Sequence, residues 1–164
     1  SFDTVNGVAA GIIHLFNHAV MKGALFLAMG CIVMRLGTTE LDQLRGIGKR
    51  MPVTMAAFVF GGLSLIGVPL TVGFVSKWYL LLGALDRDYV WVVVVLLVSS
   101  LLNVFYLLPV AVTAFFRTEE EEEGEGGIQE APWQCVVPLT CTALGCFGLF
   151  LFSDVLLSLA GLGN

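Results

Sequence analysis

The stretch "YVWVVVVLLVSSLLNVFYLLPVAVTAFF", residues 89–116, contains no charged residue and decides the fold class. A helix of roughly 20 apolar residues crosses the hydrocarbon core of a bilayer, so this stretch is long enough to span a membrane. Backbone polar groups in lipid must be hydrogen-bonded within the protein, and a helix achieves this within one segment. A soluble bundle does not carry an uncharged run of this length. We therefore predict a membrane-spanning helix at residues 90–116.

Three more apolar segments extend this prediction to the rest of the chain, at about residues 5–34, 52–85 and 133–152. Hydrophobic residues make up 57% of the sequence and charged residues 13%, which is far from the composition of soluble domains. Tyr89, Trp91 and Trp133 lie at the ends of predicted spans, as interfacial aromatic residues do. The predicted fold class is all-α, a polytopic membrane protein with about four transmembrane helices.

The charged residues are concentrated in loops. Seven of the 13 acidic residues lie between Glu119 and Glu130, and we interpret residues 117–131 as a solvated acidic loop. The first connector, residues 35–51, carries Arg35, Arg45, Lys49 and Arg50. This bias predicts that loops 35–51 and 117–131 are cytoplasmic and that the protein is a multi-pass protein of the cell (inner) membrane. The basic residues form no patch of the kind that binds nucleic acid.

The chain begins at Ser1, without a charged leader and a few residues before its first apolar span, which indicates a piece of a longer polypeptide. Its four cysteines lie in apolar segments without a C-x-x-C pair: Cys31, Cys135, Cys141 and Cys146. We therefore expect neither a disulfide nor a metal site, and nothing in the sequence predicts a cofactor or a catalytic nucleophile.

Within the first span, "HLFNHAVMK" places His14, His18 and Lys22 four residues apart. Side chains at this spacing share one face of a helix, with about 6 Å of rise between neighbours. A charged lysine exposed to lipid in the middle of a span costs at least about 2.5 kcal/mol, so this face should meet other helices or a hydrated cavity. Burial disfavours the charged form of the amine, and a nearby carboxylate favours it. Such an amine can gain or lose a proton as its neighbours change, as a proton relay requires.

Other interpretations of this ladder remain open. The two histidines could simply donate hydrogen bonds to neighbouring helices. The H-x-x-x-H spacing also suits zinc, but the zinc-protease pattern has Glu where this chain has Leu15, and no third ligand is evident. Haem ligation by facing helices would need a further histidine, and the chain has two.

The second predicted span contains "GVPLTVGFVSKWYLL", in which Gly67, Pro69 and Gly73 precede Ser76 and Lys77. Proline removes a backbone donor and glycine weakens a helix, so we predict that this span is broken at Gly67–Gly73. Discontinuous helices in the middle of the membrane recur at the ion-binding sites of transporters. The alternative is a proline kink with Lys77 reaching the membrane interface.

Polar residues also interrupt the third span. Ser99, Ser100, Asn103 and Tyr106 have helical spacings that could bring them to the same cavity. Polar side chains in membrane helices more often form hydrogen bonds between helices, which is the interpretation that we favour here.

Three blocks of the sequence, with the short match "EAPW" after them, resemble a known superfamily: "HLFNHAVMKGALFLAMG", "GIGKRMP" and "GGLSLIGVPLTVGFVSKWYLLLGAL". They are similar to the antiporter-like membrane subunits, which comprise large subunits of Mrp-type cation/proton antiporters and the proton-pumping subunits of respiratory complex I. The third block is most similar to the D-type subunit of Mrp antiporters. The resemblance covers essentially the whole chain.

The resemblance implies that residues 1–164 are the C-terminal part of a proton-conducting transporter domain built from two inverted repeats. It implies a central proton-relay role for Lys22 and His18, the next relay position for His14, and the lysine of the broken helix for Lys77. The first half-channel, with its buried Glu and Lys, would lie upstream. The partners implied are other membrane subunits, protons, and Na⁺ or another monovalent cation.

The sequence therefore predicts the proton-translocating part of a monovalent cation (Na⁺)/proton antiporter subunit, which is a transporter component rather than an enzyme. The predicted relay is His14, His18, Lys22 and Lys77. The predicted supporting residues are Gly67, Pro69, Gly73, Ser76 and Asn103. One alternative is a membrane proton-pumping subunit of a complex I-like NADH:quinone oxidoreductase or a membrane-bound hydrogenase. Another is a structural membrane subunit that transports nothing.

Overall fold

The computed structural model describes residues 5–85, 88–116, 127–153 and 155, with side chains from residue 11 onward. The helices are α1 (Val5–Leu36), η1 (Leu41–Leu44), α2 (Ile47–Arg50), α3 (Pro52–Ile66), α4 (Val72–Leu85), α5 (Val90–Phe116) and α6 (Trp133–Leu151). The described part of the chain contains no strand, so the all-α prediction is confirmed.

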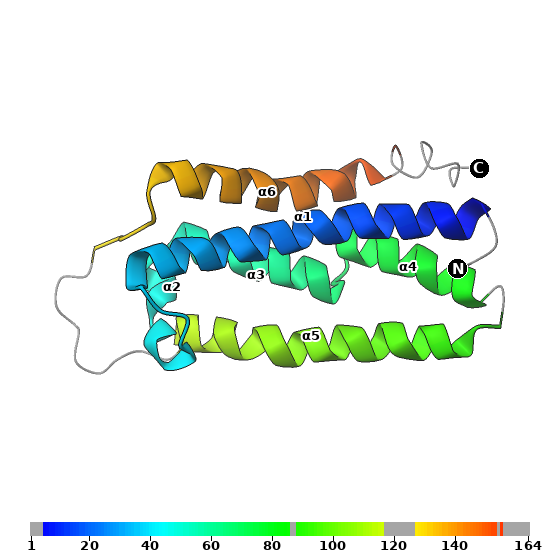
Figure 1. Ribbon diagram of the computed structural model, residues 1–164, viewed down its shortest axis with the longest axis horizontal. Coiled ribbons are helices and arrows are strands. Elements are labelled where there is room, and N and C mark those ends of the chain that lie inside the picture. The colour runs from blue at the N-terminus through cyan, green and yellow to red at the C-terminus, as the bar shows by residue number, and fades with distance from the viewer. Residues whose placement is uncertain (1–4, 86–87, 117–126, 154, 156–164) are drawn as a thin grey trace.

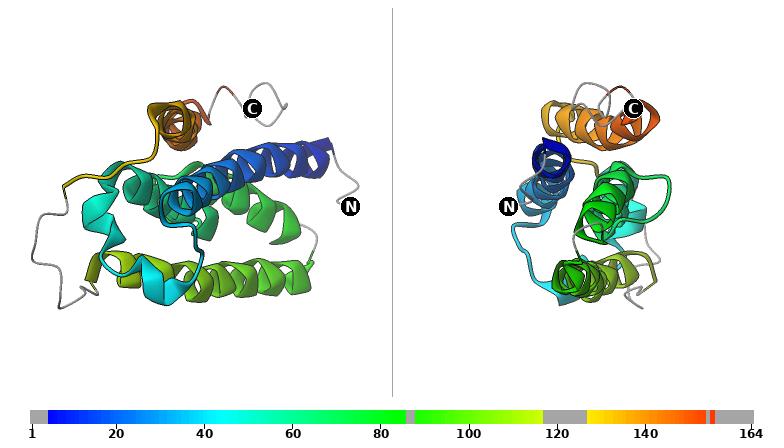
Figure 2. Two further views of the ribbon diagram at one scale, coloured as in Figure 1. Left: turned by 60° about the vertical axis from the view of Figure 1, so that its left-hand side comes forward. Right: turned by 90° about the vertical axis from the view of Figure 1, so that its right-hand side faces the viewer.

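The long helices lie roughly side by side, with α3 and α4 following one another end to end between α1 and α5 (Figure 1). Helix α6 packs against α1 and α3, on the side away from α5, as the end-on view in Figure 2 shows. Helices α1, α5 and α6 are long and apolar enough to cross a membrane, whereas α3 and α4 are shorter apolar helices. The chain is a multi-pass membrane protein in which one span consists of two helices.

The interruption between α3 and α4 follows from the glycine and proline that the sequence places there. Gly67 adopts a left-handed conformation with φ 90°, and its N–H donates to the carbonyls of Leu63 and Ser64 at 3.0 and 3.1 Å. This is a common way to end a helix, because glycine adopts positive φ without steric cost. Pro69 then lies in the non-helical segment, and α4 begins at Val72.

Gly73 has a different role from the one predicted for it. It lies inside α4 rather than in the break, which covers residues 67–71. A Cβ atom built on Gly73 would overlap the main-chain carbonyl oxygen of Ser64 and would touch the sulfur of Met21. Glycine is therefore required at this position for the close approach of α3 and α4, and not to interrupt the helix.

We expect Gly73→Ala to destabilise the protein by at least about 1–3 kcal/mol, because the added methyl group meets backbone that cannot move aside cheaply. The matched control is Gly83→Ala, on the same helix, where an added Cβ meets nothing within 4 Å. That change should be neutral or stabilising by about 0.5–1 kcal/mol. Thermal unfolding of the two variants in detergent measures the difference, and equal melting temperatures would contradict this account of the helix contact.

The glutamates of the predicted acidic loop lie mostly outside the described residues, but Glu130 is described and has a structural role. Its carboxylate accepts hydrogen bonds from the N–H groups of Val53 (2.6 Å) and Thr54 (3.3 Å) and from the Thr54 hydroxyl (2.7 Å). Its main-chain carbonyl accepts a bond from Arg35 Nε at 2.8 Å. Glu130 therefore caps the start of α3 and holds together the ends of α1, α3 and α6.

Replacing Glu130 with alanine should cost about 1–2 kcal/mol of stability, because two helical N–H groups lose an anionic acceptor. Gln129→Ala is the control, since Gln129 is exposed and contributes a main-chain bond, from its N–H to the Arg50 carbonyl, that the substitution keeps. Chemical or thermal unfolding of both variants tests the cap. A Glu130→Ala protein as stable as Gln129→Ala would show that the cap contributes nothing.

Candidate functional site

The predicted relay face of α1 meets the start of α4. His14 and His18 are both half-buried, and their ring centroids are 5.7 Å apart. His14 Nδ1 lies 3.1 Å from the hydroxyl of Ser76, a buried residue one turn into α4. The structure therefore joins two residues that are 62 positions apart in the sequence and that the motif analysis selected separately.

The Ser76 hydroxyl connects the imidazole to the backbone, because it can also donate to the Gly73 carbonyl at 3.2 Å. A hydroxyl has one proton and two lone pairs. When the Ser76 hydroxyl donates to Gly73, its oxygen can accept a hydrogen bond from a protonated His14 Nδ1. When the hydroxyl rotates, it donates instead to an unprotonated Nδ1. Ser76 can thus bond to His14 whether Nδ1 carries a proton or not, which suits a group that passes protons.

Lys77 adjoins this pair at the helix break. Its Nζ donates hydrogen bonds to the carbonyls of Leu65 (2.8 Å) and Ile66 (2.9 Å) and to the Ser100 hydroxyl (2.8 Å). The carbonyls are those of the last two residues of α3, and Ser100 belongs to α5. The ammonium is also close enough to interact electrostatically with both imidazoles. Lys77 therefore points back into the break and does not extend along α4 towards a membrane interface.

These polar groups lie at one level of the bundle. His18 is close to the middle of α1, the break lies midway between the start of α3 and the end of α4, and Ser100 is close to the middle of α5. In a helix that spans a bilayer, the middle is the most costly place for a charge. Here the three hydrogen bonds of the Lys77 ammonium, which use all its N–H groups, replace its hydration.

Lys22 and Asn103 belong to a second, separate polar region. Lys22 is exposed on the described chain. It lines a cavity of about 780 Å³ between α1, α3, α5 and the connector, together with Asn103 and Tyr106. Asn103 thus lines the same cavity as Lys22, whereas Ser100 bonds to Lys77, so the polar residues of the third span lie in two different polar regions.

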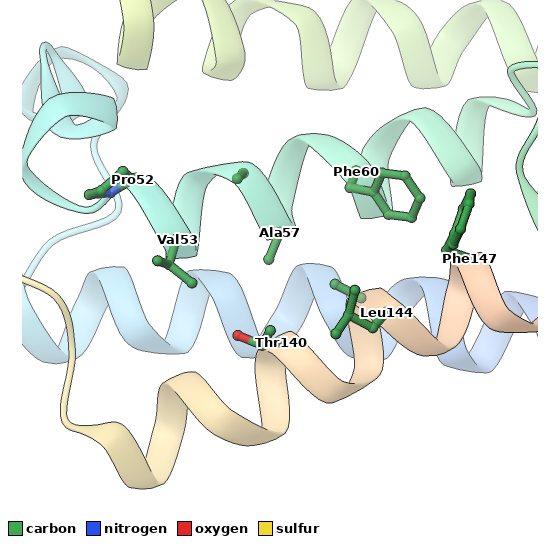
Figure 3. Close-up of a pocket in the computed structure, with 9 residues that line it drawn as sticks. Pro52, Val53, Ala57, Phe60, Thr140, Leu144 and Phe147 are labelled. Carbon is green, nitrogen blue, oxygen red and sulfur yellow. The ribbon is translucent and has the colours of Figure 1, made fainter.

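A second hollow of about 500 Å³, between α3 and α6, has none of these features (Figure 3). Its labelled side chains are apolar apart from Thr140, whose hydroxyl donates to the Val136 carbonyl of its own helix at 2.8 Å. No three His, Cys, Asp or Glu side chains of the described residues gather in a way that could hold a metal ion. The polar groups around the break and around Lys22 are therefore the candidate site.

Comparison with known proteins identifies the family of this membrane bundle. Residues 1–103 match the family described as NADH:quinone oxidoreductase/Mrp antiporter, transmembrane region. The chain belongs to this family. The resemblance found in the sequence to the antiporter-like membrane subunits is thereby confirmed.

The relatives of this chain include subunits of NADH-quinone oxidoreductases and subunits of antiporters. The NADH-quinone oxidoreductase subunit N of Desulforudis audaxviator is 37% identical over 90% of this chain and 31% of its own length. The D-type subunit of the Na(+)/H(+) antiporter of Bacillus subtilis is 31% identical over 72% of this chain and 24% of its length. A chain in the structure of the Mrp complex from Dietzia sp. superimposes with a TM-score of 0.86 at 26% identity, covering 99% of this chain and 38% of that one. The chain therefore spans well under half the length of these antiporter-like subunits.

The structure also reveals polar residues of this antiporter-like subunit that the motif analysis did not select. Asn17 and Ser64 are 1% and 0% exposed, and their side-chain polar atoms have no partner among the described residues. Asn17 lies on α1 between His14, which contacts Ser76, and Met21, which contacts Gly73. Its position three residues after His14 was a signal available in the sequence, because that spacing places both on the same helix face.

We predict that Ser76→Ala lowers the stability of this antiporter-like subunit by about 1–2 kcal/mol, because it removes the hydroxyl that links His14 to α4. Ser99→Ala is the control, since Ser99 is exposed on α5 and an exposed substitution of this kind changes stability by less than about 0.5 kcal/mol. Thermal unfolding of the full-length protein in detergent measures both. Equal effects of the two changes would mean that the His14–Ser76 contact is not formed.

Proposed function

We propose that the chain is the proton-translocating part of a monovalent cation (Na⁺)/proton antiporter subunit. The observation that carries this proposal is the Lys77 ammonium, which is held on the broken helix beside the His14–Ser76 contact. Charged groups kept at the middle of a membrane protein mark ion and proton pathways more often than they serve packing. The name of the Bacillus relative supports an antiporter.

In the proposed relay, protons pass along the face of α1 between Lys22, His18 and His14, and from there to Lys77. Neighbouring members of the ladder are one helical turn apart, and the two imidazole rings are close enough for a bridging water to connect them. Lys22 and Lys77 switch charge as their neighbours change. Gly67 and Pro69 create the break, and Gly73 allows α3 and α4 to approach closely. Asn103 adds a polar side chain to the lining of the cavity that also contains Lys22.

The proposed location is the cell membrane, with the connector after α1 and the segment before α6 on the cytoplasmic side. Both segments lie at the same end of the bundle (Figure 1). They are joined there by the hydrogen bonds from Arg35 to the Glu130 carbonyl and from the Gln129 N–H to the Arg50 carbonyl. The Lys and Arg residues of the connector favour the cytoplasmic assignment. Other membrane subunits are the proposed partners, as in the multisubunit complexes that contain the structural relatives.

Substitution of Lys22 tests the relay directly. Lys22→Ala should abolish cation-dependent proton flux in everted vesicles, because the relay loses a group that can accept and release a proton. Lys22→Arg should also fail, since arginine keeps the charge but does not release its proton. Lys49→Ala is the matched control, because Lys49 is exposed in the connector, and this variant should transport normally. Normal flux in Lys22→Ala at normal expression would refute the relay role.

A redox-driven proton pump is the second candidate, because the Desulforudis relative is named as a subunit of an NADH-quinone oxidoreductase. The same relay would serve an antiporter and a redox-driven pump, so the identity of the partner proteins distinguishes the two functions. Purification of the intact complex distinguishes the two: NADH- or hydrogen-oxidising subunits with iron–sulfur clusters favour the pump, and a complex of membrane subunits alone favours the antiporter. In a third candidate, a structural subunit, Lys77→Ala would impair assembly but leave transport per assembled complex intact.

A further inference from the structure

The three oxygen atoms around Lys77 Nζ form a small cage at the helix break. They are the carbonyl oxygens of Leu65 and Ile66 and the hydroxyl oxygen of Ser100, at 2.8, 2.9 and 2.8 Å from the nitrogen. A helix leaves its last four carbonyls without an intrahelical partner. In α3 the first two of these, of Leu63 and Ser64, accept from the N–H of Gly67, and that of Leu63 also accepts from Val68. The other two belong to the cage, which follows directly from the break.

The cage suits a positive charge and offers more oxygen atoms than a neutral amine can satisfy. An ammonium group has three N–H donors, one for each oxygen. After loss of its proton the amine has two, so one of the three oxygens, which are all at least partly buried, loses its donor. The unprotonated Lys77 side chain therefore binds the cage oxygens more weakly than the ammonium does, and a metal cation can take its place.

The chemistry of the cage points to the kind of cation. Main-chain carbonyls at the end of an interrupted membrane helix are the groups that coordinate Na⁺ in several transporters, and rings of carbonyls replace the hydration shell of K⁺ in channels. All three cage oxygens are neutral, whereas divalent cations such as Ca²⁺ and Mg²⁺ are bound with the help of carboxylates. The cage therefore favours a monovalent alkali cation.

Two further buried polar groups of the bundle have no partner among the described residues. They are the Ser64 hydroxyl, one residue before Leu65, and the amide of Asn17. Ser64 contacts Gly73 through its carbonyl, and Asn17 lies between the two α1 residues that contact α4 at Ser76 and Gly73. Polar atoms buried in this way are normally paired with protein, water or an ion. Their unsatisfied polar atoms show that this part of the bundle has room for a bound water molecule or ion.

We propose that the carbonyls of Leu65 and Ile66 and the Ser100 hydroxyl form a binding site for a monovalent alkali cation, which competes with the Lys77 ammonium for the same oxygens. Protonation of Lys77 then expels the cation, and cation binding requires Lys77 to release its proton. Such competition couples the movement of one cation to that of one proton. This consequence for transport rests on the proposed function, whereas the binding itself does not.

Thermal unfolding of the full-length protein tests the binding site. Lys77→Met keeps an apolar stem but vacates the cage, so its Tm should be higher in NaCl or KCl than in choline chloride at the same ionic strength. At a cation concentration ten times Kd, we expect a rise of about 2 °C. Lys77→Met with Ser100→Ala should lose at least half of this rise, and Lys77→Met with Ser99→Ala should keep it. Identical Tm values of Lys77→Met in sodium, potassium and choline would overturn the proposal.

A second measurement applies where Lys77→Met does not fold. Ser100→Ala in the otherwise unchanged protein removes one cage oxygen, so the cation concentration for half-maximal proton flux should increase several-fold. Ser99→Ala should leave it unchanged. An unchanged half-maximal concentration in Ser100→Ala would refute the site. Cation-specific stabilisation of a protein that shows no proton flux would support the cation site and refute the proposed function. Proton flux that does not depend on Ser100 would support the proposed function and refute the cation site.

Discussion

The structure depends on the hydrogen bonds between one amine and the carbonyl groups that lack an intrahelical partner at the end of a helix. In a membrane, an interrupted helix and a buried charge are each costly, because neither the freed carbonyls nor the ammonium can be hydrated by lipid. Here each group satisfies the other: Lys77 donates to the last two carbonyls of α3 and, with its third N–H, to Ser100 of α5. This contact makes the break stable, and it fixes the distance between α3, α4 and α5.

The pairing also explains why other polar residues gather at this level of the bundle. With α3 ending just before Gly67, the first turn of α4 packs against α3 at Gly73 and brings Ser76 to His14. The two histidines then lie within the electrostatic range of Lys77. Lys22 occupies a cavity of its own with Asn103 and Tyr106. The proposed relay therefore has two groups of residues, one on the broken helix and one at this cavity, with the face of α1 between them.

Much of this architecture could be predicted from the sequence, because hydrophobic length and helix-breaking residues act locally. The bounds of α5 agree with the predicted span, and the break occurs where glycine and proline follow an apolar run. The local pattern also selected both His14 and Ser76. It could not show that they meet, since contacts between α1 and α4 depend on packing rather than on neighbouring residues.

The features that the sequence did not reveal are those in which a residue acts on a distant element. Gly73 resembled a helix breaker, but its small size permits a helix contact with Ser64. Glu130 was grouped with the acidic tract by composition, and it caps a helix that begins 78 residues earlier. Ser99 and Ser100 are adjacent serines that face different directions on α5. Which of them meets Lys77 depends on where α4 packs, and the sequence does not show this.

High-resolution cryo-electron microscopy of the full-length protein in a lipid nanodisc tests the central claim most directly, because it locates Lys77 Nζ relative to both the helix break and the lipid headgroups. Our account predicts density for the ammonium between the Leu65 and Ile66 carbonyls and Ser100, at the mid-depth of the bilayer. A Lys77 side chain extended to the headgroups, with α3 and α4 joined in one continuous helix, would contradict it.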